Sequence, residues 1–207
     1  MTEAKLFSLL NEENLNDFSK TEVPSRLLLG PGPSNAHPEV LRALSLNPIG
    51  HLDEAYLRLM SDVQRLLRYV WQCDNRITLP MSGTGSAAME ASIANFIEEG
   101  ERVLIASKGY FGDRLVDMAN RYKADVCVLK KNWGEAFSLE ELKYQIETKK
   151  PAIFAIVHAE TSSGVLQPLD GIGEVCRKNN CLFLVDAVTS LGAVELLIDE
   201  WKIDLAY

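Results

Sequence analysis

The chain of 207 residues is 47% hydrophobic and 24% charged, which are ordinary proportions for a soluble globular protein. Its length is sufficient for one large domain, or for a domain with an extension. The formal net charge of −8, with no basic cluster, argues against a protein that binds nucleic acid.

The four cysteines, Cys73, Cys127, Cys176 and Cys181, form no C-x-x-C pair and have no histidine at metal-ligand spacing. Because Cys127 and Cys181 stand in apolar, strand-like runs, we expect them to act as small hydrophobic residues. These features favour a reducing, intracellular compartment, without a disulfide framework or a metal site. No apolar stretch approaches the length of a membrane helix, and the N-terminus is too acidic for a signal or transit peptide.

The first part of the chain, residues 1–23, is polar and has no core of its own. We expect an N-terminal arm here, with one short helix over residues 4–10, ending at Pro24. The following segment, residues 27–35 (LLLGPGPSN), runs from an apolar triplet into alternating Gly and Pro, which exclude both a helix and a central strand. The segment is either an ordinary loop or a stretch of backbone that lines a ligand site and lets the ligand approach closely.

Two helices are expected next. The first covers residues 37–46, with Pro38 in its first turn. The second covers residues 53–69 and is amphipathic. His51 precedes the second helix, and a lone loop histidine of this kind is more often structural than catalytic.

From Arg76 onward, apolar strand-like runs alternate with helical segments. The expected strands are 77–81, 102–106, 126–129, 153–158, 182–185 and 205–207. The expected helices are 86–97, 113–122, 139–148 and 172–179. This alternation predicts an α/β fold, with a mostly parallel sheet covered by helices. Right-handed crossovers then bring the C-terminal ends of the strands to a common edge.

The segment 82–90, SGTGSAAME, follows the first expected strand and opens a helix. Gly83 and Gly85 permit tight backbone geometry, while Thr84 and Ser86 place hydroxyls beside free helix N–H groups. Such a helix start is a ready anion site, and phosphate is its usual occupant. The segment lacks the lysine of a P-loop and the third glycine of the dinucleotide fingerprint. An ordinary Ser/Thr helix cap is the alternative interpretation.

Three later strand ends also carry polar or aromatic residues. Residues 108–112 (KGYFG) set two aromatics between glycines, where a ring can stack on a flat ligand or simply pack in its loop. Residues 158–164 (HAETSSG) bring three hydroxyls. At the last of these ends, the apolar run 181–185 stops at Asp186, which is either a turn cap or a ligand group, since open α/β sheets bind ligands at this edge.

An anion site, an aromatic platform, a hydroxyl and a carboxylate thus occur in this order on successive strand ends. The combination describes a pocket for a flat, phosphorylated, nitrogen-containing ring. A carboxylate beside the ring nitrogen would keep it protonated and make the ring an electron sink. Pyridoxal 5'-phosphate fits that description.

On these motifs the chain resembles the alanine–glyoxylate and serine–pyruvate aminotransferases of the class V, fold-type I pyridoxal-phosphate enzymes. The resemblance extends from Leu27 to Tyr207 through LLLGPGPSN, SGTGSAAMEA, HAETSSGVLQPLDGIGEVC and LVDAVTSLG, with IDLAY downstream. It implies that residues 24–207 are a truncated large, cofactor-binding domain with three α/β/α layers, and that the C-terminal small domain is missing.

The resemblance implies seven cofactor-binding residues: Thr84, Gly85, Ser86, Phe111, Thr161, Asp186 and Val188. The segment 84–86 would bind the phosphate, and Phe111 would stack on the pyridine ring. Thr161 would reach the phenolic oxygen, Asp186 would pair with the pyridinium nitrogen as the catalytic carboxylate, and Val188 would pack on the opposite ring face.

Two departures from the family pattern bear on function. The platform aromatic is typically Trp in the alanine–glyoxylate group, so Phe111 leaves the substrate open. The Schiff-base lysine of the family lies in a turn just after the strand corresponding to residues 205–207, so we expect the chain to end before it. Lys202, in the exposed-looking segment 200–202, lies before that strand and is interpreted as a surface lysine, whereas Lys108 lies on the ligand edge with no family role.

The leading hypothesis is an incomplete form of an aminotransferase that moves an amino group from alanine or serine to glyoxylate or pyruvate. Another class V chemistry, such as cysteine desulfuration, is less favoured because no cysteine looks poised to carry sulfur. A non-catalytic or pseudo-enzyme fragment rests on the missing lysine alone, and a nicotinamide dehydrogenase would need the absent glycine fingerprint.

The family also implies the partners and the compartment. Substrates would be small amino acids and 2-oxo acids, and the complete form would be a homodimer. From the charge and the lack of long apolar stretches, we expect neither nucleic acid nor a membrane as a partner. The compartment would be the cytoplasm or the peroxisome, whose signal would lie at a C-terminus.

Overall fold

The computed structural model describes residues 23–207 of the chain. The chain divides into two compact units, Met1–Leu46 and Asn47–Tyr207, which are described separately. The expected arm and its helix over residues 4–10 lie outside the described residues, apart from Val23.

In the first unit, the Gly/Pro-rich segment has no regular secondary structure, as expected. Asn35 folds it back on itself, because its Oδ1 accepts a hydrogen bond from the Leu28 backbone N–H (2.8 Å) and its Nδ2 donates to the Arg26 carbonyl (3.0 Å). Helix α3 (Pro38–Leu44) then begins with proline in its first turn and His37 as its N-cap, which confirms the expected helix.

The second unit opens with helix α4 (Glu54–Trp71), capped by Asp53, whose Oδ1 accepts from the Ala55 N–H at 2.8 Å. The strand expected over residues 77–81 is wrong, because these residues have no regular secondary structure. Ile77 is 80% exposed, and no strand within residues 23–207 pairs with it. A strand needs a neighbour to complete its ladder, and Pro80 has no N–H to contribute to one.

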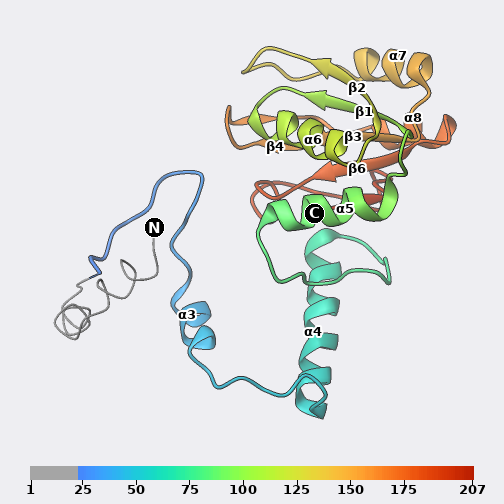
Figure 1. The fold of residues 1–207 in the computed structure, drawn as a ribbon. Helices are drawn as coiled ribbons and strands as arrows, with labels where there is room; N and C mark the ends of the chain where they lie inside the picture. Colours follow the sequence, from blue (N-terminus) through green and yellow to red (C-terminus); the bar gives the residue numbers. More distant parts are fainter. Residues whose placement is uncertain (1–22) are drawn as a thin grey trace, which may run out of the picture. The chain divides into compact units, whose positions relative to one another are not determined.

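The sheet of the second unit is parallel throughout, with strand order β2-β1-β3-β6-β7 (Figure 1). Its strands are β1 (Arg102–Ser107), β2 (Asp125–Lys130), β3 (Ile153–Val157), β6 (Leu182–Asp186) and β7 (Leu205–Ala206). The continuous apolar runs that predicted β1, β3 and β6 are the central strands, buried on both faces.

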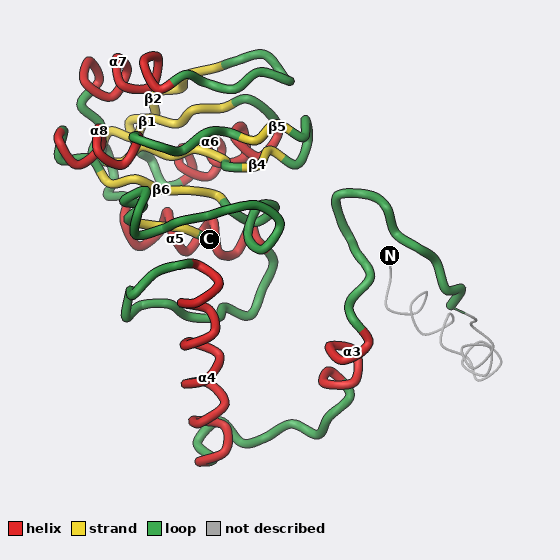
Figure 2. Tube along the Cα trace, turned by 180° about the vertical axis from the view of Figure 1, so that it is seen from behind, coloured by secondary structure: helices red, strands yellow, loops and turns green. Residues whose placement is uncertain are grey.

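Helices cover both faces of this sheet, which gives the expected three-layer arrangement. The helices are α5 (Gly85–Phe96), α6 (Tyr110–Arg121), α7 (Leu139–Lys149) and α8 (Ile172–Lys178). Figures 1 and 2, seen from opposite sides, show α5 and α6 on one face and α7 and α8 on the other.

Successive side chains of each strand point to opposite faces, and this alternation divides the core in two. On β3, Phe154 and Ile156 pack with α7 and α8. Ile153, Ala155 and Val157 pack with α5 and α6.

Chain order determines where a ligand can enter this sheet. The connection from β1 through α6 leads outward to β2, whereas the connection through α7 returns to β3 on the other side of β1. The sheet therefore has a topological switch point between β1 and β3, and ligands of open α/β sheets bind beyond the carboxyl ends of the strands at such a point.

A short antiparallel hairpin, β4 (Ala159–Glu160) and β5 (Val165–Leu166), follows β3 and was not expected. Strands of two residues carry too little periodicity to be read from sequence. Its turn nevertheless carries the hydroxyl cluster of the HAETSSG motif.

The segment before β7 also differs from expectation. Trp201 is only 9% exposed, and its ring meets the His158 ring edge-on at a centroid distance of 5.8 Å, so the segment is not simply solvated. Lys202 is half-buried and its Nζ forms an ion pair with Glu174 of α8. Because it precedes β7, Lys202 lies at the end of the sheet opposite to the strands' carboxyl ends, as expected.

Among the described residues, no helix combines the length and apolarity needed to cross a membrane. In the same part of the chain, no group of His, Cys, Asp and Glu side chains could hold a metal ion. Cys73, Cys127, Cys176 and Cys181 are all free, and Cys176 and Cys181 are buried.

Candidate functional site

A cavity of about 130 Å³ opens at the carboxyl ends of the central strands. It brings together all of the expected cofactor-binding residues except Thr84: Gly85, Ser86, Phe111, Thr161, Asp186 and Val188. Met89 and Val157 complete the lining and were not expected there. Thr84 is adjacent, as the N-cap of α5.

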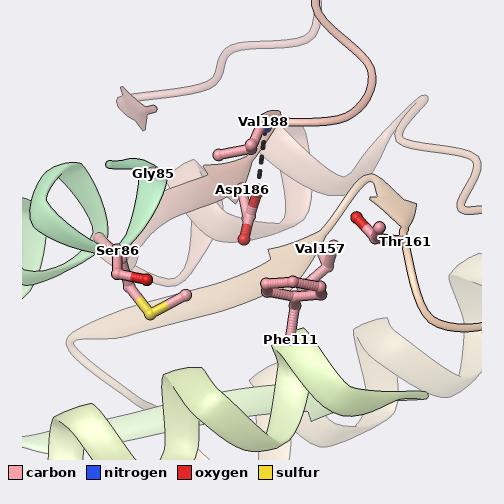
Figure 3. Close-up of a pocket in the computed structure, with 8 residues that line it drawn as sticks. Gly85, Ser86, Phe111, Val157, Thr161, Asp186 and Val188 are labelled. Atoms are coloured by element: carbon pink, nitrogen blue, oxygen red, sulfur yellow. Dashed lines mark hydrogen bonds between the residues drawn. The ribbon is translucent and has the colours of Figure 1, made fainter. Parts of the chain in front are cut away.

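Asp186 ends β6 and points into this cavity between the Phe111 ring and Val188 (Figure 3). Asp186 is only 4% exposed. Oδ1 accepts a hydrogen bond from the Val188 backbone N–H at 3.1 Å, and Oδ2 accepts one from the Tyr207 hydroxyl at 3.2 Å. The carboxylate is therefore held in one orientation by a partner on each oxygen.

Opposing influences act on the ionisation of this carboxylate. Burial is the largest and raises the pKa of Asp186 above its usual value, and the nearby Glu160 charge acts in the same direction. The Val188 N–H, the Tyr207 hydroxyl and the Lys108 ammonium each lower that pKa. A cationic group that enters the cavity would also lower the pKa of Asp186.

Helix α5 points its N-terminus at the same cavity. The side chain of its N-cap, Thr84, makes no capping hydrogen bond, so the hydroxyl is not used by the helix itself. A Cβ at Gly85 would lie 3.0 Å from Val188 Cγ2, which is tighter than an ordinary contact. Glycine therefore lets the helix start approach the β6 loop closely, with the Ser86 hydroxyl at the cavity wall (Figure 3).

Phe111 lies in the first turn of α6 and forms the side of the cavity opposite Val188 (Figure 3). Its ring also packs against the core shared by α5 and α6 and meets the Tyr110 ring edge-on at 5.3 Å. The sequence left open whether this aromatic would line a ligand site or pack in a loop. It lines the cavity and packs against the core, but from helix α6, which begins three residues earlier than the expected helix over residues 113–122.

Thr161 lies beyond β4, and its hydroxyl is hydrogen-bonded to the hydroxyl of Thr189. Thr189 follows β6, so this contact ties the hairpin to the loop that carries Val188. Nothing local in the sequence indicates which strand end Thr189 will face.

Sequence reasoning missed the charged residues buried beneath the cavity. Lys108 is 1% exposed and donates a hydrogen bond from Nζ to the Val157 carbonyl at 2.6 Å. Burial lowers the pKa of Lys108 from 10.5 to about 8, against the opposing influence of Glu160 and Asp186. Glu160 itself is 0% exposed. Lysine and glutamate are usually solvated, so only the position of Lys108 directly after an apolar strand could have signalled its burial.

Comparison with known proteins gives the family of the chain. The model of the family described as aminotransferase class V matches residues 28–207. The chain belongs to the class V aminotransferase family. Within this family, it is 44% identical over 185 residues to alanine–glyoxylate aminotransferase of Mus musculus, an alignment covering 89% of this chain and 45% of that protein.

Another class V relative is the (S)-ureidoglycine–glyoxylate transaminase of Bacillus subtilis (strain 168), 43% identical over 183 residues, which cover 88% of this chain and 44% of that protein. Among solved structures, an alanine–glyoxylate aminotransferase from Nostoc sp. is 61% identical, with a TM-score of 0.88, covering 92% of this chain and 52% of that one. The chain thus spans about half the length of the relatives it matches.

Proposed function

We propose that the chain is the cofactor-binding part of a pyridoxal-phosphate-dependent aminotransferase. The complete protein transfers an amino group from a small amino acid, alanine or serine, to glyoxylate or pyruvate. The observation that supports this most is the cavity itself, in which a buried, doubly hydrogen-bonded carboxylate, Asp186, faces an aromatic ring, Phe111. Two of the relatives are an alanine–glyoxylate aminotransferase and an (S)-ureidoglycine–glyoxylate transaminase, which supports glyoxylate as the acceptor.

The residues present fit pyridoxal phosphate in both shape and charge. The α5 N-terminus, with Thr84 and Ser86, offers backbone N–H groups and hydroxyls to a phosphate. Phe111 and Val188 offer opposed faces for a flat ring, and the close approach allowed by Gly85 narrows the space between helix and loop. Thr161 would hold the phenolic oxygen.

Pyridoxal phosphate, when bound, supplies an electron sink that stabilises negative charge developing on the substrate carbon. Asp186 contributes to this by holding a proton at the ring nitrogen, since an ionised carboxylate favours the charged form of its partner. Val188 N–H and Tyr207 Oη keep both carboxylate oxygens oriented for that task. Phe111 covers one face of the ring and excludes water from it.

The test compares two purified proteins, the 207-residue chain and the product of the complete transcript, each titrated with pyridoxal phosphate. The product of the complete transcript is expected to bind the cofactor, with an absorbance band that borohydride abolishes, and to form pyruvate from alanine in the presence of glyoxylate. Light scattering on the same sample is expected to give a homodimer. A product of the complete transcript that neither binds the cofactor nor consumes alanine or serine would favour the non-catalytic alternative.

A further inference from the structure

Glu160 is a buried carboxylate to which the proposed function gives no task. It is 0% exposed and lies on β4, beside the cavity but not in its lining. Its Oε1 accepts hydrogen bonds from the backbone N–H of Phe111 (3.3 Å) and from both the N–H (3.2 Å) and the hydroxyl (2.7 Å) of Ser162. Its Oε2 accepts one from the Gly112 N–H at 3.2 Å.

These contacts close the start of helix α6, which has no cap of its own. The N-cap residue is Gly109, and it makes no side-chain capping hydrogen bond. The N–H of Tyr110 donates instead to the Ser162 hydroxyl at 3.0 Å. The amides of the first turn, which have no partner within a helix, are thus satisfied from a hairpin that lies 50 or so residues further along the chain.

Gly109 makes this long-range cap possible. A Cβ at that position would lie 2.4 Å from Glu160 Cγ and 2.6 Å from the Ser162 hydroxyl oxygen. Any side chain would therefore displace the carboxylate from the helix start. Gly109, the first glycine of the KGYFG motif, thus allows the Glu160 carboxylate to lie against the start of the helix.

The charge of Glu160 is compensated without solvent. The α6 N-terminus favours a negative group through its aligned peptide dipoles. Lys108 adds a buried positive charge that interacts with Glu160 and, more weakly, with Asp186. The hydrogen bonds, the helix N-terminus and the buried ammonium thus all hold the Glu160 carboxylate against the first turn of α6.

We propose that Glu160 is a positioning residue that sets the place of the Phe111 ring opposite Asp186. It acts through the Phe111 backbone, because the amide that it binds belongs to the residue whose ring lines the cavity. This inference rests on the proposed function for the identity of the ligand, and on the contacts of Glu160 for the anchoring itself. A purely structural helix cap would stabilise the fold equally well without affecting the ligand.

The matched control is Glu141, which helps to cap α7, another helix that packs on the same sheet. Its Oε2 accepts from the Ser138 N–H at 2.7 Å, and Ser138 in turn caps α7, on the face opposite the cavity. Glu141→Gln removes a capping charge as Glu160→Gln does, but away from Phe111. Because Glu141 is exposed and also ion-paired with Lys131, Glu141→Gln is expected to lower the unfolding temperature less than Glu160→Gln and to leave ligand binding unchanged.

The first measurement is the affinity of the full-length protein for pyridoxal phosphate in a double-mutant cycle. Glu160→Gln is expected to raise the dissociation constant about tenfold, because the Phe111 ring that covers the ligand is then less firmly positioned. In a Phe111→Ala background the same change is expected to have less than about a twofold effect, because coupled residues are not additive. Equal losses in both backgrounds, or an equal loss with Glu141→Gln, would overturn the proposal.

The second measurement is amide hydrogen exchange without cofactor, and it separates this proposal from the proposed function. Glu160→Gln is expected to accelerate exchange at Phe111 and Gly112, and unchanged exchange there would overturn the positioning role. Accelerated exchange in a protein that binds no pyridoxal phosphate would leave the anchoring intact and refute the proposed function. Should Glu160→Gln not fold, Ser162→Ala removes the shorter of the supporting contacts and is expected to act in the same direction.

Discussion

Tyr207 Oη donates a hydrogen bond to Asp186 Oδ2 at 3.2 Å and thereby joins β7 to the carboxyl end of β6. The backbone next to Asp186 is linked to Tyr207 as well, since the Ala187 N–H donates to the Tyr207 carbonyl at 2.8 Å. Burial raises the pKa of Tyr207, and the Asp186 charge raises it further, so the phenol stays protonated and remains a donor. The last strand therefore supports the carboxylate that the cavity presents.

Tyr207→Phe tests this support. The substitution keeps the ring and removes the donor, so we expect the free energy of unfolding to fall by about 1 kcal/mol. The pKa of Asp186 is expected to rise, because the lost hydrogen bond lowers it in the parent protein. Carbon-13 NMR titration of the carboxyl groups measures that change, and Tyr144→Phe, at a residue 65% exposed, is the control. An unchanged Asp186 titration would contradict the expectation.

Asp186→Asn separates stability from activity. The amide keeps the shape of the carboxylate but cannot hold a proton at a ring nitrogen, so we expect transaminase activity of the complete protein to fall on the order of a hundredfold or more. Stability is expected to stay the same or to rise, because a buried charge that the fold disfavours is removed. Calorimetry and an alanine–glyoxylate assay on the same sample check both expectations, and a parallel loss of both would point to a folding defect.

Lys108→Met tests the buried ammonium through the pH dependence of stability. The folded pKa of about 8 lies below the unfolded value of 10.5, so the unfolded chain binds more protons between these values. Lys108 therefore destabilises the fold below pH 8, by at most about 3 kcal/mol, and this destabilisation is relieved as the pH rises to 10.5. Urea unfolding at several pH values is expected to show a rise in stability over this window that is smaller in Lys108→Met. Identical pH profiles for the two proteins would contradict the assignment.

His158→Phe makes the corresponding test in acid. Burial, and to a lesser extent the Lys108 ammonium, lower the pKa of His158 from 6.5 to about 4. Between these values the unfolded chain binds the additional proton, so the contribution of His158 to stability is lost as the pH falls from 6.5 to 4. His158 Nδ1 is also buried without a hydrogen-bond partner, so phenylalanine removes a polar atom that the core does not satisfy. We expect the variant to be at least as stable at pH 7 and to lose less stability in acid, measured by thermal unfolding against pH.

The sequence was most informative where a local pattern determines structure. Continuous apolar runs predicted the central strands, and the abrupt stop at Asp186 predicted a carboxylate at the ligand edge. Phe111 could be placed beside it because parallel strands share one carboxyl edge, whereas the same argument for Gly85 relied on a strand over residues 77–81 that does not form. For residues 77–81 the predicted strand was wrong, because an apolar run forms a strand only when another strand lies beside it.

The contacts that hold the site together could not be predicted in the same way. Glu160 caps a helix that begins 50 residues earlier in the chain, and no local signal pairs the two. Lys108 belongs to a residue type that is usually solvated, and yet it is buried with its Nζ bonded to the Val157 carbonyl of another strand. Long-range contacts of this kind depend on the complete fold.

Strands β1, β3 and β6 are neighbours in the sheet, and each carries one group of the site at its carboxyl end. Phe111 follows β1, Thr161 follows β3 through β4, and Asp186 ends β6. Adjacent strands stand about 4.8 Å apart. The hydrogen bonds between the strands therefore fix the spacing of the strand ends, whatever the lengths of the loops. Loops after the strand ends can therefore change in length, and with them the ligand that is admitted, while the spacing of the strand ends from which Phe111, Thr161 and Asp186 project stays the same.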